Sequence, residues 1–501
     1  MWKILTSLLM LIATVVLIPP AAASTSTISW KPCAEDSAVD CGTLTVPLDW
    51  GDSGGETIKL ALARRKATDP GARIGSLVVN PGGPGGSGVQ TVVQNRMRFS
   101  PEITSRFDIV GFDPRGVGGS HPIRCSRELA SQAPDPFLKN QAEFERLLSH
   151  NQRYKKDCRA RTGPLFDHVD TVSVARDLDA MREALGDDKL SFYGISYGTL
   201  MGQIYAELFP RNVRALALDS NMDHSLGTRA FLDTQAWTTQ DSFDEFVKWC
   251  GKTTSCALHG KNIRTFWANL LARAERGELH YPGEPDVPLT KLLLIYEATG
   301  GSFGPTWADL ADFLVAADSG SGKARSMLKP LPKQEEIKDA TQVFCLDYLL
   351  PIRNYREYAA HLKSSRKIAP DMLAGPEALA TTAACLGQQA PIPNPQHRLK
   401  VSGPKLLVAN ALHDPATGYN WAVSTAKQLG AAGRLFTYEG WGHRIYDHGE
   451  CAVNGIDRYL VALKLPAKGA RCPAVPPSAS KKSAYEPPPG PVPGLPGWVR
   501  S

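Results

Sequence analysis

The 501-residue chain is predicted to be an α/β protein, with a mostly parallel sheet and helices on both faces. Short apolar runs end repeatedly in glycine, proline or aspartate, as buried strands do. Amphipathic helical segments alternate with these runs. One long interval without this alternation separates the last two strand candidates from the others. The sequence therefore predicts one sheet with a large insertion.

Six apolar runs are the clearest strand candidates. They cover residues 74–80, 107–113, 189–194, 213–220, 404–414 and 434–443. Residues 171–186 repeat apolar side chains at spacings of 4, 3 and 4, which places these side chains on one helical face. Thr171 is the expected N-cap of this helix, and Gly186 is its expected stop. Residues 417–430 are a second helix candidate between two strands.

The interval from 221 to 402 is far too long for a loop. It is rich in aromatic residues and helical segments, and we expect an inserted, mainly helical cap domain. The core is then built from residues 24–220 and 403–472. Residues 473–501 are rich in proline and are expected to form an extended or disordered tail.

The first 23 residues have the features of a signal peptide. An early lysine precedes an apolar run, and Ala23 ends a cluster of small residues that suits cleavage. A membrane anchor is the alternative. The run from Ile4 to Ile18 is shorter than the roughly 20 apolar residues of a spanning helix, and prolines follow it. We expect a secreted, extracellular protein without a stable membrane anchor.

The ten cysteines agree with export, because disulfides form in oxidising compartments. Sequence alone leaves the connectivity open, and we expect neighbours to pair. The expected pairs are Cys33–Cys41, Cys125–Cys158, Cys250–Cys256, Cys345–Cys385 and Cys451–Cys472. A zinc site at Cys250, Cys256 and His259 is disfavoured, because it lacks a CxxC pair.

The composition excludes some function classes. A hydrophobic content of 43% and a charged content of 21% are ordinary for a globular protein. The net charge of +6 is spread along the chain without a dense basic block. We therefore expect no nucleic-acid partner. The oligomeric state is left open.

The pentapeptide GISYG, residues 194–198, lies where a strand candidate meets an apolar helix. It fits the G-x-S-x-G nucleophile elbow, in which a strained turn lifts the serine hydroxyl above the sheet. Glycines flank the serine because side chains there would strike the neighbouring strand and helix. The pattern predicts Ser196 as a nucleophile. A glycine-softened helix start is the alternative.

A serine hydroxyl needs a base to remove its proton. Asp414 and His443 follow the last two strand candidates, in the chain order acid then histidine. We expect Asp414 to orient His443, and His443 to deprotonate Ser196. His413 adjoins the acid and cannot easily turn back onto it. This chemistry requires neither a metal nor an organic cofactor.

Two backbone N–H groups are expected to stabilise the oxyanion. The loop NPGGPGGSG, residues 80–88, follows the first clear strand, and Gly83 is its expected donor. Tyr197 is the other. The same loop matches G-x-G-x-x-G, which suggests a dinucleotide site with Asp113 as the ribose-binding acid. That alternative is disfavoured, because it leaves Ser196 unexplained.

Five segments in order resemble the secreted tripeptidyl-aminopeptidase branch of the prolyl-aminopeptidase-type α/β-hydrolases. They are NPGGPGGSG, GFDPRGVGGS, GISYGT, LLVANALHDPATGY and GWGH. The resemblance covers nearly the whole chain from Trp30 to Cys472. It implies an α/β-hydrolase fold and a serine peptidase that releases short peptides, expected to be tripeptides, from substrates with free N-termini. Carried over by position, it assigns the same triad and oxyanion donors.

An aminopeptidase must also bind a protonated amine, and a carboxylate in the cap would do so. Asp347 and Asp223 are the candidates, although each could be a structural acid. A carboxylesterase or lipase would use the same triad, and the triad cannot separate these activities. A catalytically silent binding protein on the same fold is disfavoured, because all three triad residues are present in order.

Overall fold

The computed structural model describes residues 27–320, 326, 329–330, 335–477, 490–495 and 499–500. The predicted signal peptide, 1–23, lies outside these residues. So does much of the predicted tail, 473–501. None of the helices over the described residues has the length and apolarity needed to cross a bilayer.

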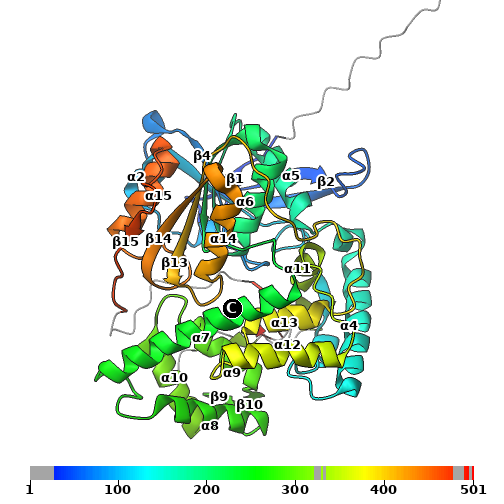
Figure 1. The fold of residues 1–501 in the computed structure, drawn as a ribbon. Helices are drawn as coiled ribbons and strands as arrows, with labels where there is room; N and C mark the ends of the chain where they lie inside the picture. The colour runs from blue at the N-terminus through cyan, green and yellow to red at the C-terminus, as the bar shows by residue number, and fades with distance from the viewer. Residues whose placement is uncertain are drawn as a thin grey trace, which may run out of the picture.

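The secondary structure alternates between strands and helices (Figure 1). The strands are β1 (Lys31–Pro32), β2 (Asp40–Pro47), β3 (Thr57–Arg65), β4 (Gly75–Asn80), β5 (Phe107–Phe112), β6 (Arg124–Ser126), β7 (Leu190–Ile195), β8 (Val213–Asp219), β9 (His280–Tyr281), β10 (Glu284–Pro288), β11 (Lys329–Pro330), β12 (Glu336–Lys338), β13 (Leu406–His413), β14 (Gly433–Trp441), β15 (Arg471–Cys472) and β16 (Val499–Arg500). The helices are α1 (Gly88–Val93), α2 (Pro101–Arg106), α3 (Arg127–Ser131), α4 (Gln141–Thr162), α5 (Thr171–Ala184), α6 (Tyr197–Leu208), α7 (Thr228–Lys252), α8 (Ile263–Glu275), α9 (Lys291–Gly300), α10 (Trp307–Ser319), α11 (Thr341–Asp347), α12 (Tyr355–Ile368), α13 (Pro376–Cys385), α14 (Tyr419–Leu429) and α15 (Glu450–Ala462). Short 3-10 turns cover Pro70–Ala72, Pro164–Asp167, Pro210–Asn212 and Gly430–Ala432.

The central sheet has the strand order β1-β2-β3-β5-β4-β7-β8-β13-β14-β15. The first three strands pair antiparallel, and β3 also pairs antiparallel with β5. From β5 onward every pairing is parallel. Because parallel strands end at the same edge, the loops after β4, β7, β13 and β14 meet there. The predicted α/β class with a mostly parallel sheet is confirmed.

Alternating side chains of the strands pack on opposite faces of the sheet. Val78 of β4 joins the cluster with α5, α6 and α14, whereas Leu77 and Val79 join the cluster with α1, α2 and α15. This period of two is the expected geometry of a strand buried on both faces. It explains why these strands read as continuous apolar runs.

The helix predicted over 171–186 is α5, but its N-cap is Asp170 and not Thr171. The Asp170 carboxylate accepts a hydrogen bond from the Ser173 N–H at 2.9 Å. Both residue types are good caps, and the choice depends on which side chain precedes the first helical residue. Gly186 follows the helix with φ +75°, as expected of a left-handed stop.

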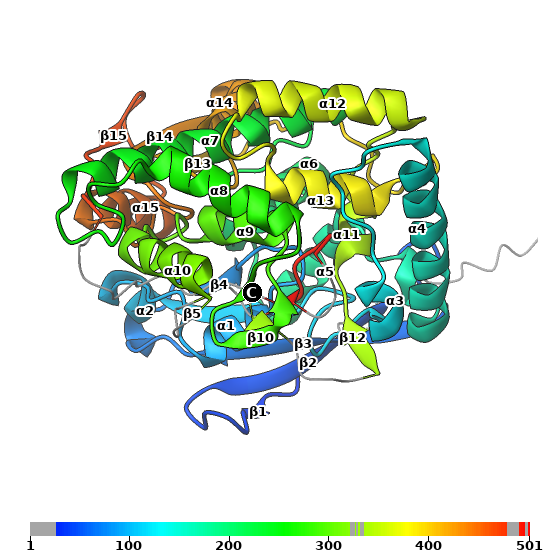
Figure 2. The same ribbon diagram turned by 90° about the horizontal axis from the view of Figure 1, so that it is seen from below.

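The cap lies between β8 and β13 and covers the carboxyl edge of the sheet (Figures 1 and 2). Its core contains buried residues of α7–α10, α12 and α13, including Trp267 and Trp307. Helix α4, which precedes the predicted insertion at 221–402, also contributes to this core. Phe144 of α4 contacts Tyr358 of α12, with ring centroids 6.1 Å apart. The cap is therefore built from more than one stretch of the chain.

All ten cysteines are in disulfides. The bonds join the sequence neighbours Cys33–Cys41, Cys125–Cys158, Cys250–Cys256, Cys345–Cys385 and Cys451–Cys472. Cys345–Cys385 connects α11 to α13, and Cys451–Cys472 connects α15 to β15. Cys250 and Cys256 are consumed in this way, which removes the zinc alternative.

Arg115, in the DPRG segment, braces the core from a fully buried position. Its guanidinium donates to both oxygens of the buried Asp177 carboxylate, at 2.6 and 2.7 Å. It also donates to the carbonyl oxygens of Pro47, Leu48 and His168. These bonds join the β2 end, the loop after β5 and helix α5.

We expect Arg115→Leu to lower the free energy of unfolding by about 3–5 kcal/mol, because it leaves the Asp177 carboxylate buried without its cation. Urea unfolding of the purified protein measures this effect. The double variant Arg115→Leu, Asp177→Leu should lose less free energy of unfolding than Arg115→Leu alone, because no unpaired buried charge remains. Equal stability of the wild type and Arg115→Leu would contradict a bracing role.

Candidate active site

Ser196 lies in the sharp turn between β7 and α6. Its backbone takes φ +56° and ψ −124°, a strained conformation that costs about 1–3 kcal/mol. A Cβ at Gly194 would lie 2.5 Å from the Gly198 carbonyl oxygen, and a Cβ at Gly198 would lie 2.8 Å from the Asn80 carbonyl oxygen. Both flanking glycines are therefore required by close backbone approach. Ser196 is half-buried, and its position at the start of α6 is that of a nucleophile elbow.

Asp414 and His443 are hydrogen-bonded at the ends of β13 and β14. His443 Nδ1 lies 3.0 Å from Asp414 Oδ1 and 3.1 Å from Oδ2. The carboxylate also accepts hydrogen bonds from the N–H groups of Ala416 and Thr417, each at 2.9 Å. Both side chains are buried. The acid thus holds the imidazole in one orientation.

The charges around His443 favour its protonated form. Burial lowers the pKa of His443, but the Asp414 charge and hydrogen bond oppose it, and Glu377 and Asp219 act in the same direction as Asp414. The net result is a pKa above the ordinary 6.5. An imidazole poised in this way can accept a proton near neutral pH.

The loop that carries His443 is fixed from two sides. The cap contributes Phe303, whose carbonyl oxygen accepts the His443 N–H at 2.7 Å and whose ring centroid lies 4.9 Å from the imidazole. The core contributes Asp219 at the end of β8, which accepts the Ile445 N–H at 2.9 Å and the Tyr193 hydroxyl at 2.8 Å. Burial raises the pKa of Asp219 to about 6. The histidine therefore depends on both domains.

Ser196 and His443 line one cavity of about 140 Å³ between core and cap. Gly83 and Tyr197, the predicted oxyanion donors, line it too. The other lining residues are Pro81, Pro84, Gly86, Met222, Phe231, Gln235, Tyr296, Phe303, Phe344, Glu377, Thr381, Ala416, Thr417, Trp421, Gly490, Pro491, Val492 and Pro493. The structure thus brings together every residue predicted for acyl transfer, with Asp414 directly behind His443.

The glycine-rich loop lies directly against the elbow. A Cβ at Gly82 would lie 2.8 Å from the Ser196 Cβ and 3.1 Å from the Tyr197 nitrogen. Asp113, the acid of the dinucleotide alternative, accepts the Ser87 hydroxyl at 2.6 Å and the Gly119 N–H at 2.7 Å. Asp113 is buried and stabilises this loop. It is therefore not available to bind a ribose, as the dinucleotide alternative requires.

Among the described residues that line the cavity, neither predicted amine-binding acid appears. Asp347 is fully buried and accepts hydrogen bonds from the Thr171 N–H at 2.9 Å, the Asn394 amide at 2.8 Å and the Tyr197 hydroxyl. Burial, together with the nearby Asp170 charge, raises the pKa of Asp347 to about 7. Asp347 thus joins α5 and α11 to the first residue of the elbow helix.

Asp223 is buried at the start of the cap. Its Oδ1 accepts the Ser225 N–H at 2.9 Å and the Gln428 amide at 3.0 Å. This carboxylate closes a local turn against α14. The amine-binding role expected of Asp347 and Asp223 has no support at either position, because neither carboxylate lines the cavity that holds Ser196.

A different carboxylate, Glu377 in the first turn of α13, lies in the cavity wall with His443. The Gln235 side-chain amide of α7 donates to its Oε2 at 2.5 Å, and Oε1 of the same side chain accepts the Ala378 N–H at 2.7 Å. Tyr296 of α9 lines the same wall, and its buried hydroxyl makes no hydrogen bond within the described part of the chain. Three cap helices therefore meet around one acidic group.

Burial raises the pKa of Glu377 to about 7, with Asp414 raising it further and His443 and Gln235 lowering it. The carboxyl group is therefore poorly solvated when no cation faces it. An ammonium group in the cavity would favour the ionised form and would be held by it. The cavity thus has Ser196 and His443 on the core side and a buried carboxyl group, that of Glu377, on the cap side.

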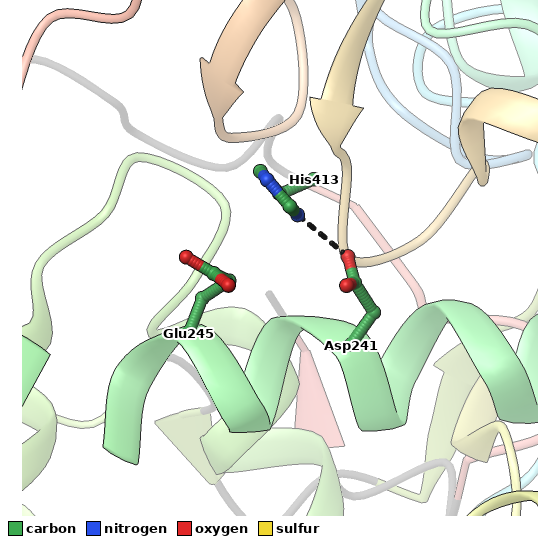
Figure 3. A group of neighbouring side chains, drawn as sticks. All are labelled: Asp241, Glu245 and His413. Carbon is green, nitrogen blue, oxygen red and sulfur yellow. Dashed lines mark hydrogen bonds and ion pairs between the residues drawn. The ribbon is translucent and has the colours of Figure 1, made fainter. Parts of the chain in front are cut away.

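A second polar cluster joins the cap to the strand ends outside the cavity (Figure 3). His413 Nδ1 lies 2.8 Å from Asp241 Oδ2 on α7, and the Trp441 indole N–H donates to Glu245 at 2.9 Å. The His413 and Trp441 rings are stacked, with centroids 5.9 Å apart. These contacts clamp α7 to the ends of β13 and β14, the strands that precede Asp414 and His443.

Comparisons with known proteins agree with this geometry. Residues 75–449 match the family model of the alpha/beta hydrolase fold. The chain is 32% identical over 485 residues to the serine protease Hip1 of Mycobacterium tuberculosis, covering 89% of this chain and 91% of that protein. It is 38% identical over 218 residues to a tripeptidyl aminopeptidase of Streptomyces lividans, covering 42% of this chain and 41% of that protein. It is 31% identical over 479 residues to a carboxylesterase B of Mycobacterium tuberculosis, covering 89% of each chain.

Proposed function

Because this chain belongs to the alpha/beta hydrolase family, in its branch of serine peptidases, we propose that it is a secreted aminopeptidase. It releases short peptides, with tripeptides as the expected product, from substrates with a free N-terminus. The serine peptidase and tripeptidyl aminopeptidase relatives support this reaction class. The five disulfides support secretion, because such bonds persist in oxidising compartments.

The proposed roles follow the positions of the side chains. His443 removes the proton of Ser196 as the hydroxyl oxygen attacks the scissile carbonyl carbon. The N–H groups of Gly83 and Tyr197 stabilise the oxyanion. His443 then gives its proton to the departing amine, and the acyl group stays on Ser196. Water, deprotonated by His443, attacks the ester carbonyl carbon. The bond from this carbon to the Ser196 oxygen then breaks, His443 returns the proton to Ser196, and the peptide is released as its carboxylic acid.

The observation that carries the aminopeptidase assignment is the place of Glu377. It shares the cavity with Ser196 and His443, and the Gln235 amide holds its carboxylate. An N-terminal ammonium group would pair with Glu377 and could donate to the Tyr296 hydroxyl, whose oxygen has no other partner among the described residues. The distance from Glu377 to Ser196 would then determine how many residues are released.

The test of this function is the product pattern from an unmodified peptide of about ten residues, which is long enough to release several tripeptides in succession. Mass spectrometry should show successive release of N-terminal tripeptides and no cleavage of the N-acetylated peptide. Internal cleavage of both peptides would contradict the assignment. The Ser196→Ala variant is the control for contaminating peptidases.

A carboxylesterase is the second candidate, and two observations favour it. The wall of the cavity near Ser196 is largely apolar, with Met222, Phe231, Phe344 and Trp421. A carboxylesterase B relative covers most of the chain. Such an enzyme would hydrolyse simple acyl esters with the same triad, and it would have no use for a buried carboxylate opposite the nucleophile.

The rate of hydrolysis should fall as the pH is lowered, and the midpoint of this fall should lie above pH 6.5. The neutral imidazole of His443 is the active form, and its pKa is raised, so lowering the pH through that pKa removes the base. Protonation of Glu377, whose pKa is about 7, acts in the same direction on amine binding. Initial rates from pH 5 to 8 measure this, and a flat profile would contradict the role of His443.

A further inference from the structure

Part of the C-terminal tail forms a wall of the active-site cavity. Gly490, Pro491, Val492 and Pro493 line the same cavity as Ser196. The described C-terminal residues, drawn in red, lie among the cap elements near α11 in Figure 2. Nothing in the triad chemistry requires these residues, and their position needs a separate explanation.

The segment packs directly on the oxyanion loop. A Cβ at Gly490 would lie 2.2 Å from the Gly85 carbonyl oxygen, and a Cβ at Gly85 would lie 3.0 Å from the Pro491 carbonyl oxygen. The two backbones touch without intervening side chains, which only glycine permits at both places. This loop also carries Gly83, the proposed oxyanion donor, and Gly83 and the tail residues line the same cavity.

The segment also packs on the cap. The Gly494 N–H donates to the Thr341 hydroxyl of α11 at 3.1 Å, and a Cβ at Gly494 would lie 2.5 Å from the Ala380 carbonyl carbon of α13. Leu495 is only 6% exposed and belongs to the hydrophobic core of the cap. Val492 to Leu495 form a turn, with the Leu495 N–H donating to the Val492 carbonyl oxygen at 3.2 Å and φ +73° at Gly494.

We propose that Gly490–Leu495 is an intramolecular inhibitor, which occupies the substrate cleft between the oxyanion loop and α13 and must be displaced by a peptide substrate. The cavity of about 140 Å³ that remains is below the roughly 300–1,000 Å³ of ordinary ligand pockets. A proline-rich segment loses little conformational entropy on docking. Its tether to the core gives it an effective concentration of the order of millimolar, so weak contacts suffice to keep it docked.

The inference requires only that Ser196 is reactive, and it does not depend on which substrate the enzyme cleaves. If the docked state holds about nine-tenths of the molecules, the apparent affinity for a competing ligand is reduced about tenfold. Removal of the segment should therefore raise the apparent affinity about tenfold. Small acyl esters, which fit the remaining cavity, should gain much less.

The test compares the full-length mature chain, a chain ending at Pro477 and the full-length variant Leu495→Asp, which puts a charge into the cap core. Val475→Asp is the matched control, because this side chain is in the same tail but 50% exposed. We measure kcat/KM for a tripeptide anilide and the rate at which a bulky fluorophosphonate labels Ser196. We expect both rates to rise about tenfold in the shortened chain and in Leu495→Asp, and to stay unchanged in Val475→Asp.

Equal labelling rates in all four proteins, with unchanged melting temperatures, would overturn the proposal. Faster labelling without anilide cleavage would support the inhibitor and reject the peptidase function. A synthetic peptide of residues 486–501, added to the shortened chain, should slow labelling, whereas a scrambled peptide should not. If the shortened chain does not fold, Leu495→Asp alone decides, and an unchanged labelling rate in a folded Leu495→Asp protein would overturn the proposal.

Discussion

Replacing Ser196 with alanine is expected to lower kcat for the tripeptide anilide by about 10⁴-fold or more, because the acyl-enzyme can no longer form. The fold should survive, since Ser196 makes no side-chain cap to α6 and its hydroxyl is not needed for packing. Steady-state kinetics with the purified protein measure the effect, and circular dichroism checks the fold.

Ser131→Ala is the matched control, since Ser131 is exposed at the end of α3. It should leave kcat unchanged. His443→Ala should reduce kcat by a similar factor to Ser196→Ala, and the double variant should lose little more, because the two groups act as a unit. Independent, multiplicative losses would contradict a shared proton transfer between Ser196 and His443.

Replacing Glu377 with glutamine is expected to lower kcat/KM about 10–100-fold for peptides with a free amine, because a charge-assisted contact of about 1.5–3 kcal/mol is lost. Hydrolysis of a simple acyl ester should be nearly unchanged, because that substrate has no ammonium group. Parallel kinetics with both substrates separate loss of amine recognition from general damage to the site.

Two further variants bracket the Glu377 result. Glu357→Gln, in the first turn of α12 and outside the cavity lining, should leave the hydrolysis of both substrates unchanged. Asp347→Asn should lower kcat/KM for both substrates to a similar extent. It should also lower the melting temperature, because the Asp347 carboxylate accepts hydrogen bonds from the Tyr197 hydroxyl and from the first residue of α5. If Glu377→Gln reduced ester hydrolysis as much as peptide hydrolysis, Glu377 would be a structural acid as well.

Much of the fold could be predicted because buried parallel strands are apolar along their whole length. Residues 189–194 and 404–414 were recognisable for that reason, and they correspond to β7 and β13. The placement of the candidate triad could be predicted because the strained elbow needs glycines at 194 and 198, and because sheet topology brings the ends of β13 and β14 to the same edge.

The cap site could not be predicted, because nothing local distinguishes Glu377. A glutamate after Pro376 in the first turn of a helix is an ordinary helix start. Its proposed role depends on α7 and α9, which bring Gln235 and Tyr296 to it across a long sequence distance. Asp347, in contrast, follows a cysteine in a recognisable segment, but burial and three neighbouring donors make it a structural acid.

The tail was expected to be extended or disordered because of its proline content, and composition alone carries no information about a docking partner. What matters at Gly490 and Gly494 is the absence of a side chain against Gly85 and Ala380. Such a contact is invisible until the glycine-rich loop and α13 are placed on either side. Composition thus predicted neither the turn at Val492–Leu495 nor the docking of this segment between the loop and α13.

The most direct measurement is the ratio of kcat/KM for a tripeptide anilide with a free N-terminus to that for the same anilide after N-acetylation. A site in which Glu377 shares the cavity of the nucleophile predicts a ratio of about 100 in the wild type, from the loss of one buried ion pair, and a ratio of about 1–10 in Glu377→Gln. Equal cleavage of both anilides by the wild-type protein, or cleavage of acyl esters alone, would contradict an aminopeptidase.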